Sequence, residues 1–260
     1  MSESRTATRS VQIVARSRDL PGFESAAPFA AGYVDGSPDA LALVPSDAAT
    51  GASAEVPADR LLTLHRALPP SLALLVPPLA TAMSFWDRLG LELGDAAVYT
   101  DGGPLSRLTG QVALWRGGYP VVELGPSAAA QVPDIVRIDW TDAEDAAKRL
   151  GEATASRPGF AAVEHSGRAE VLDTLLETMP RWSRLLLAST GGGAVTIDYY
   201  KNVHRKGAVV DATVGDAAAL FEPHLGGAAR AQVPRAIQWM ERPALAARCA
   251  AALGLLPAGQ

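Results

Sequence analysis

From about residue 72 onward, hydrophobic positions alternate between helical spacing and short continuous hydrophobic runs. Helical spacing predicts helices with one buried face, and the short runs predict buried strands. Strands that alternate with helices of this length are typical of βαβ units, so the pattern predicts an α/β fold with a parallel sheet. The expected strands are 96–99, 120–124, 134–138, 160–164, 184–189, 195–199 and 208–213, and the expected helices are 79–89, 105–116, 142–156, 169–179, 217–221 and 234–255.

Residues 1–60 have a different composition, rich in Ala, Pro, Ser, Gly and Asp. Their short hydrophobic runs, at 11–14 and 40–44, predict two or three short strands in a loop-rich segment. About 60 residues rarely bury an independent core, so we expect this segment to lean on the later part of the chain. The expected organisation is a β-rich segment at 1–60, an α/β domain at 61–215, and a helical segment at 216–260 that packs back on the N-terminal part.

Composition narrows the class of protein. The net charge of −5 comes without a clustered basic excess, so we expect no nucleic-acid partner. The single cysteine, Cys249, excludes an internal disulfide and a zinc site of several thiolates, and it is expected to be a buried small hydrophobe. There is no secretory signal pattern, and Pro77 and Pro78 interrupt the longest apolar run. We therefore expect a cytoplasmic protein without a membrane segment.

The turn after the first strand of the α/β domain predicts a nucleotide site. In a doubly wound sheet, ligands bind at the carboxyl ends of the strands where strand order reverses. Glycines in that turn let the backbone approach a pyrophosphate at a helix N-terminus. Glu123 follows Gly103 by twenty residues, where an acid accepts hydrogen bonds from ribose hydroxyls and repels a 2′-phosphate. These features predict NAD, although each alone is also compatible with a structural role. The expected cofactor-binding residues of the turn are Asp101, Gly102, Gly103, Pro104, Leu105 and Ser106.

Five segments, in one order along the chain, carry a resemblance to a known family. They are Val56-Pro57-Ala58-Asp59-Arg60-Leu61, Pro78-Leu79-Ala80-Thr81-Ala82, Gly94-Asp95, Val163-Glu164-His165-Ser166-Gly167, and the stretch from Ile197-Asp198-Tyr199-Tyr200 to His204-Arg205-Lys206-Gly207. Together they resemble the medium-chain dehydrogenase/reductase superfamily, the zinc alcohol- and polyol-dehydrogenase-like proteins.

The resemblance implies a Rossmann-like doubly wound parallel sheet that follows a shortened remnant of the family's GroES-like catalytic domain at 1–60. The resemblance also implies that the loop with Thr190 and Gly191 lies near the nicotinamide ring. It further implies that the stretch from Ile197 to Gly207 forms a strand hairpin. Since the family joins two edge strands across a two-fold axis, it also implies a homodimer through residues 195–210.

Departures from the family pattern point away from a standard dehydrogenase. Against the family's G-x-G-P-V-G motif, Asp101 replaces the first glycine and Ser106 the third. A carboxylate beside a pyrophosphate is unfavourable unless it points away or is neutralised. Residues 1–60 contain neither Cys nor His, and Pro77 replaces a glutamate that precedes the matching family segment. Because His65, His165, His204 and His224 are also far apart in sequence, we expect no catalytic zinc.

His165 is the candidate catalytic acid or base, because it follows a strand at the carboxyl edge of the sheet. The alternative is an exposed or capping histidine. Tyr199, Tyr200 and Lys201 suggest a Tyr/Lys acid–base pair, but packing at an interface is the favoured interpretation. The tryptophans at 140, 182 and 239 are expected in a core or an interface rather than as stacking platforms.

Three functions remain open from the sequence. The first is a zinc-independent oxidoreductase that uses NAD(H) on a small hydroxylated or carbonyl metabolite. The second is a redox-neutral enzyme, in which Asp101, Glu123, Glu164 or His165 performs acid–base chemistry in the former cofactor cleft. The third is a non-catalytic protein that binds a partner. Fold alone does not decide between them.

Overall fold

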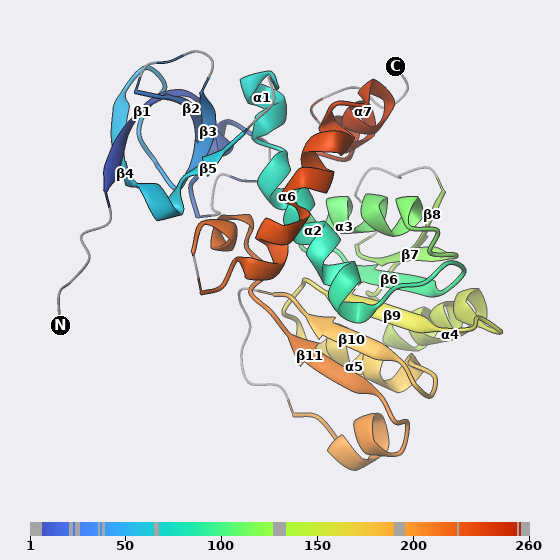
Figure 1. The fold of residues 1–260 in the computed structure, drawn as a ribbon. Helices are drawn as coiled ribbons and strands as arrows, with labels where there is room; N and C mark the ends of the chain where they lie inside the picture. Colours follow the sequence, from blue (N-terminus) through green and yellow to red (C-terminus); the bar gives the residue numbers. More distant parts are fainter. Residues whose placement is uncertain are drawn as a thin grey trace, which may run out of the picture. The chain divides into compact units, whose positions relative to one another are not determined.

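The computed structural model describes residues 7–20, 23, 27–35, 37, 40–64, 68–126, 134–189, 196–222, 224–253 and 255 (Figure 1). The chain divides into two compact units. One unit combines Met1–Thr81 with Asp216–Gln260, and the other is Ala82–Gly215. No helix in the described part of the chain is long and apolar enough to cross a membrane.

The unit built from both ends of the chain contains an antiparallel sheet in the order β4-β1-β2-β3-β5. Hydrophobic residues at alternate positions of its strands, such as Val11 and Ile13, form its buried core. Arg230 Nη2 donates to the carbonyl of Asp59, at 3.1 Å, and so joins a C-terminal helix to the N-terminal segment. The elements are β1 (Thr8–Arg16), β2 (Ala30–Val34), β3 (Leu41–Val44), β4 (Ser53–Pro57), β5 (Leu62–Thr63), α1 (Pro70–Ala73), α6 (Gly227–Met240) and α7 (Pro243–Ala252), with 3₁₀ turns at Ser17–Asp19, Ala58–Arg60 and Ala217–Phe221.

Two sequence predictions for this unit are wrong. The described N-terminal segment has more strands than the expected two or three, because β4 buries only Val56 fully and carries little hydrophobic pattern. The single helix expected at 234–255 is two helices, α6 and α7. Pro243 explains the break, since proline cannot continue a helix but is favoured at the first helical position.

Cys249 lies on α7 and is fully buried, as the sequence predicts. Burial raises the pKa of its thiol to about 12. Because the thiolate is the reactive form, we expect the native protein to react with an aromatic disulfide reagent such as DTNB at mildly alkaline pH only as fast as it unfolds. The measurement compares the reaction rate in buffer and in denaturant. Rapid labelling of the native protein would contradict this burial.

The second unit contains a parallel sheet in the order β11-β10-β9-β6-β7-β8. Numbered from β6 along the chain, these strands have the order of the dinucleotide-binding fold, in which the first strand lies at the centre of the sheet. The predicted α/β fold class is therefore confirmed. The elements are α2 (Val76–Leu89), which enters from the first unit, β6 (Ala96–Thr100), α3 (Pro104–Trp115), β7 (Val121–Leu124), β8 (Ile135–Ile138), α4 (Ala143–Thr154), β9 (Phe160–Glu164), α5 (Ala169–Thr178), β10 (Arg184–Leu187), a π-helix at Tyr199–His204, and β11 (Val209–Ala212).

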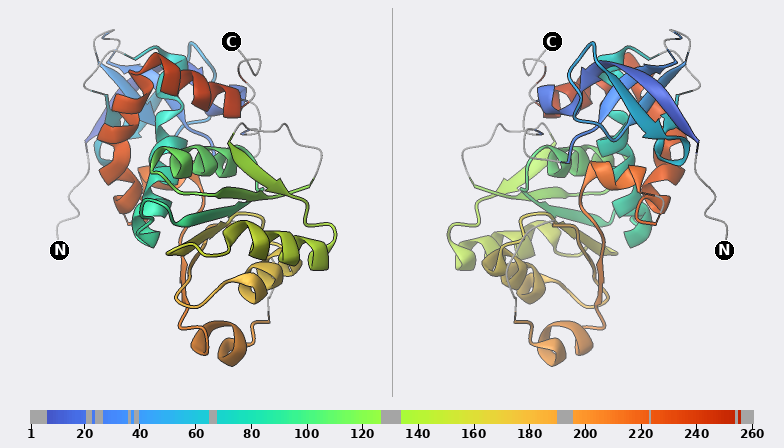
Figure 2. Two further views of the ribbon diagram at one scale, coloured as in Figure 1. Left: turned by 90° about the vertical axis from the view of Figure 1, so that its right-hand side faces the viewer. Right: turned by 90° about the vertical axis from the view of Figure 1, so that its left-hand side faces the viewer.

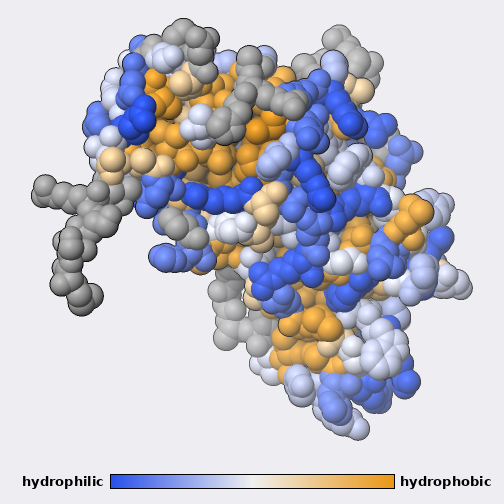
Figure 3. Space-filling model, in the orientation of Figure 1, coloured by the Kyte–Doolittle hydropathy of each residue, from blue (hydrophilic) through white to orange (hydrophobic). Residues whose placement is uncertain are grey.

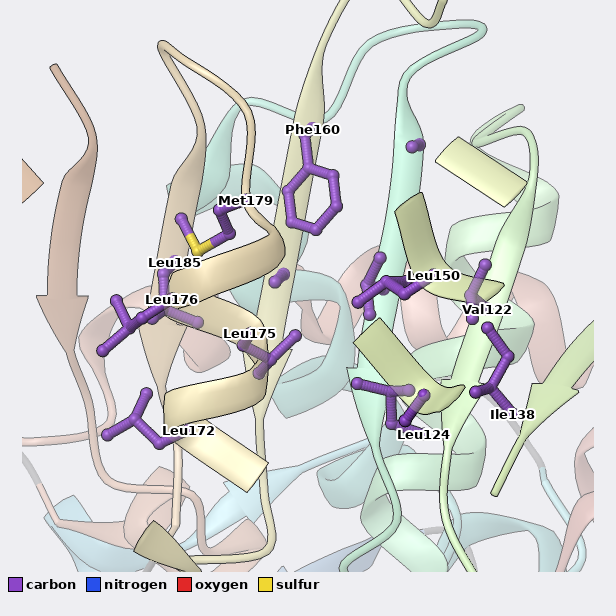
Figure 4. Packing of buried hydrophobic residues seen from close by; sticks show 14 residues of the cluster. Val122, Leu124, Ile138, Leu150, Phe160, Leu172, Leu175, Leu176, Met179 and Leu185 are labelled. Atoms are coloured by element: carbon purple, nitrogen blue, oxygen red, sulfur yellow. The ribbon is translucent and has the colours of Figure 1, made fainter. Parts of the chain in front are cut away.

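Helices cover both faces of this parallel sheet (Figure 2). On one face, Val98 of β6 belongs to a buried hydrophobic cluster. Figure 4 shows other members of this cluster, among them Val122 of β7, Leu150 of α4 and Leu175 of α5. Successive residues of a strand point to opposite faces, so Tyr99 points to the other side, where its ring meets Gly110 of α3. The two faces are therefore set by alternate positions of the same strands.

The prediction of a strand at 195–199 is wrong. Residues 196–198 have no regular structure, Tyr199–His204 forms a π-helix, and Val195 lies outside the described residues. The carboxylate of Asp198 accepts from the amide of Lys201 at 2.9 Å, and so caps the helical turn that replaces the expected hairpin. The edge strand is β11, which pairs in parallel with β10. Trp182, which the sequence predicts in a core or an interface, is 78% exposed, so the core is excluded and the interface stays a prediction.

Candidate functional site

The strand order of the parallel sheet reverses between β6 and β9, the place where this type of sheet binds ligands. A cavity of about 370 Å³ lies there. Its walls come from the segments that follow β6, β7, β8 and β9, all within one compact unit. The lining residues are Asp101, Gly102, Gly103, Pro126, Trp140, His165, Ser166 and Arg168.

The turn between β6 and α3 is closed by its own side chains. The Gly103 amide donates to Asp101 Oδ1 at 3.2 Å, and the Gly102 amide donates to Ser106 Oγ at 3.1 Å. Ser106 Oγ in turn donates to the Gly103 carbonyl at 2.6 Å. Asp101 and Ser106, which stand at two glycine positions of the G-x-G-P-V-G motif, therefore accept hydrogen bonds from two backbone amides of the turn.

The glycines of the turn serve different purposes. A Cβ on Gly102 would lie 2.6 Å from both Cβ and the carbonyl oxygen of His165, so only glycine allows the two loops to approach this closely. Gly103 has φ +100°, and nothing lies within 4 Å of the position its Cβ would take. The space beside Gly103 is therefore open to a ligand. Pro104 is the first residue of α3, and Leu105 beside it is buried.

A buried hydrogen-bond cluster shapes the loop after β9. Thr100 Oγ1 accepts from the amides of His165, at 2.7 Å, and Ser166, at 3.0 Å. Glu164 Oε1 accepts from the amides of Ser166, at 2.7 Å, and Gly167, at 2.9 Å, and from the Ser166 hydroxyl. Thr100 Oγ1 lies 3.3 Å from the same carboxylate oxygen. Glu164 is 2% exposed, so it positions this loop from beneath.

Hydrogen bonding fixes the tautomer of His165. Its Nε2 lies 3.1 Å from Thr109 Oγ1, and the Thr109 hydroxyl donates to the Leu105 carbonyl at 2.9 Å. Because a hydroxyl has one hydrogen, Thr109 accepts from His165, so Nε2 carries the proton and Nδ1 is the acceptor. Burial lowers the pKa of His165 to about 3. The imidazole of His165 is therefore neutral.

We expect the imidazole of His165 to remain neutral, as the Nε2–H tautomer, between about pH 5 and 8. Long-range proton–nitrogen NMR spectra recorded across this range measure it directly. The folded-state pKa lies below the usual value of 6.5, so the unfolded chain takes up the proton first as pH falls. His165 therefore leaves the free energy of unfolding unchanged above pH 6.5 and lowers it as the pH falls from 6.5 towards 3. A titration midpoint near 6.5 in the folded protein would contradict this environment.

Glu123 does not line this cavity. The strand register places it beside Tyr99 of β6 and Arg137 of β8, on the face that α3 covers. Its side chain is 2% exposed, and its Oε1 lies 2.6 Å from Arg137 Nη2. Burial and the nearby Glu123 carboxylate raise the pKa of the Tyr99 phenol well above its usual value. The role of Glu123 as the ribose ligand stays a prediction.

Four of the lining residues are not among the residues predicted from the sequence: Pro126, Trp140, Ser166 and Arg168. Each follows a strand end, so the rule that singled out the first turn applies to them as well. Trp140 lies at the cavity instead of in a core, and the Arg168 guanidinium sits over its ring, 5.2 Å from the centroid. Thr190 and Gly191 lie outside the described residues.

In the described part of the chain, no group of three or more His, Cys, Asp and Glu residues is placed to hold a metal ion. His65 lies outside that part. The expectation that the protein uses no zinc stays a prediction.

No family model and no curated protein matches the sequence of this chain. Solved structures do match its fold. Galactitol-1-phosphate dehydrogenase from Escherichia coli has a TM-score of 0.65 at 12% identity, over 99% of this chain and 92% of its own. The 2R,3R-butanediol dehydrogenase from Bacillus subtilis has a TM-score of 0.61 at 14% identity, over 94% and 92%. The chain has the medium-chain dehydrogenase/reductase fold. CurA from Vibrio vulnificus, solved in complex with NADPH, has a TM-score of 0.62 at 15% identity, over 98% and 88%.

Proposed function

We propose that the protein is a zinc-independent oxidoreductase of the medium-chain dehydrogenase/reductase type that binds NAD(H) and acts on a small hydroxylated or carbonyl metabolite. The observation that carries this proposal is the cavity at the reversal of strand order, where Gly103 leaves open space at the first turn of α3. The similar CurA structure, solved in complex with NADPH, supports a nicotinamide dinucleotide as the class of ligand.

The residues at the cavity fit a dinucleotide in three respects. Gly103 leaves room for a ligand at the N-terminus of α3, where a helix favours negative charge. The Arg168 guanidinium lies at the wall, where its Nε also pairs with Glu170 Oε1 at 2.7 Å, and Trp140 supplies an aromatic surface. A nicotinamide held there would donate or accept the hydride, while these residues would bind and orient it. Two side chains of the turn oppose an anionic ligand: the Asp101 carboxylate accepts from the Gly103 amide, and Ser106 Oγ accepts from the Gly102 amide.

His165 suits a structural role better than a general-acid role. With a pKa of about 3, the imidazole is neutral at neutral pH, and its one N–H, at Nε2, donates a hydrogen bond to Thr109. It therefore has no acidic proton for a substrate. Its ring contacts Thr109 and, at 5.5 Å between ring centroids, Phe85, both of them buried, so we assign it a role in positioning the loop after β9.

Calorimetric titration with NAD⁺, NADH, NADP⁺ and NADPH tests the proposal. We expect micromolar binding of the NAD pair, weakened several-fold by Arg168→Gln because a positive charge at the cavity wall is lost. Arg181→Gln is the matched control, since Arg181 is exposed and does not line the cavity. Absence of binding by every dinucleotide at millimolar concentration would overturn the proposal.

The closed turn at Asp101 and Ser106 favours the redox-neutral enzyme as the second candidate. Of the four residues considered for its acid–base chemistry, Asp101 and His165 line the cavity, whereas Glu123 and Glu164 are buried and held by other residues. A cavity that binds no dinucleotide but does bind a small polar metabolite would favour this candidate.

We also propose a homodimer through the edge of the parallel sheet at β11. Its exposed edge can pair with a second copy, and large exposed hydrophobic side chains accompany it: Trp182, Tyr199, Tyr200 and Val209. Figure 3 shows hydrophobic residues over the region of β10 and β11. Light scattering after size exclusion should give twice the chain mass for the wild type and the single mass for Val209→Asp. A monomeric wild type would contradict the proposal.

A further inference from the structure

The Asp101 carboxylate is bonded to a backbone amide at the N-terminus of α3, where a helix favours an anion. Asp101 Oδ1 accepts from the Gly103 amide, at 3.2 Å, and lies 3.5 Å from Ser106 Oγ. In the described part of the chain, no ion pair neutralises this carboxylate. The open space beside Gly103 is therefore bordered by a negative charge.

The Asp101 side chain also packs against the segment that follows β7. A Cβ on Gly125, which follows β7, would lie 2.8 Å from Asp101 Cβ and 3.6 Å from its Oδ2. The Asp101 side chain is thus packed against the backbone of Gly125, with its carboxylate turned to the Gly103 amide. An anion that approaches the first turn of α3 meets an amide that is already bonded and a like charge beside it.

We infer that Asp101 is an internal competitor of the ligand's diphosphate, and that it sets the affinity and selectivity of the cavity. The inference rests on the proposed function, because it supposes that the cavity receives a dinucleotide. A diphosphate must displace the carboxylate from Gly103 and tolerate its charge, whereas a ligand without phosphate does neither. Asp101 therefore weakens the binding of NADH and ADP and leaves that of adenosine unchanged.

Two variants separate the charge from the hydrogen bond. Asp101→Asn keeps an oxygen that can accept from Gly103 and removes the charge, whereas Asp101→Gly removes both. Asp173→Asn is the control, because Asp173 is an exposed acid of α5 that does not line the cavity. Calorimetric titrations with NADH, ADP and adenosine are run on all four proteins, and thermal melts check that each is folded.

We expect Asp101→Asn to bind NADH and ADP at least about tenfold more tightly than the wild type. Asp101→Gly should bind them at least as tightly as Asp101→Asn. Adenosine should bind all four proteins equally, and Asp173→Asn should behave as the wild type.

Three results would overturn the inference. If the wild type binds NADH and neither Asp101 variant binds it more tightly, the competitor role fails and the proposed function stands. If adenosine binding improves as much as ADP binding, Asp101 acts through the shape of the loop and not through competition. If neither the wild type nor the variants bind any dinucleotide, the inference and the proposed function both fail.

Discussion

Replacement of Glu123 by alanine is expected to lower the free energy of unfolding by about 3–5 kcal/mol. The side chains of Glu123 and Arg137 are 2% and 12% exposed, and their charged atoms lie 2.6 Å apart between neighbouring strands. Without the carboxylate, the Arg137 guanidinium stays buried beside an empty space. Water in that space replaces the lost hydrogen bond and charge only poorly. Urea unfolding of the wild type and the variant measures the difference.

The control for this prediction removes both charges. Glu123→Ala combined with Arg137→Leu should recover part of the lost stability, because it leaves no guanidinium without its buried carboxylate. A loss below about 1 kcal/mol for Glu123→Ala alone would instead indicate a solvated pair, as at protein surfaces. Because Glu123→Ala changes the sheet itself, Glu123→Gln is the variant with which to test a contact to ribose.

Gly102→Ala is expected to lower the free energy of unfolding by about 1–3 kcal/mol and to prevent dinucleotide binding. The new Cβ would lie 2.6 Å from Cβ and the carbonyl oxygen of His165, so one of the two loops at the cavity has to move. Thermal unfolding and an NADH titration measure the two effects. A variant as stable as the wild type would show that the loops do not meet as described.

Gly151→Ala is the matched control for this substitution. Gly151 lies in α4, and nothing lies within 4 Å of the position its Cβ would take. Alanine there should stabilise the protein by about 0.5–1 kcal/mol, because it favours the helix. The same change is thus expected to have opposite signs at the two positions.

The elements of the parallel sheet are predictable where hydrophobic runs and end signals agree. β9 has the predicted bounds, Phe160–Glu164, because five consecutive buried residues lie between turn-forming segments. The predicted start of α4 at Asp142 is confirmed, since the Asp142 carboxylate accepts from the amides of Glu144 and Asp145. Local chemistry determines both features, so the sequence is sufficient for them.

Predictions fail where a capping side chain or a tertiary neighbour decides the structure. Ile197 and Tyr199 have strand-forming side chains, but the carboxylate of Asp198 caps the helical turn that begins at Tyr199. β5, Leu62–Thr63, is too short for any periodicity and forms because β3 offers a partner. Neither outcome is visible in a hydrophobic pattern.

The candidate site also has features that the sequence predicts and features that it does not. The strand-end rule finds Asp101, Gly102 and Gly103 from the sequence, and the structure places all three at the cavity. The direction of Glu123 depends on the register of β7, which turns this residue towards α3. The hydrogen bond from the Gly103 amide to Asp101 depends on side-chain geometry, which no spacing of residues predicts.

We propose that the cavity between the loops after β6 and β9 binds a dinucleotide. Amide hydrogen exchange of the wild-type protein, with and without saturating NADH, tests it most directly. We predict slower exchange in residues 101–106 and 165–168 on addition of NADH, and no change in α4 or in the antiparallel sheet. Unchanged exchange in both loops, or protection confined to another part of the chain, would contradict the claim.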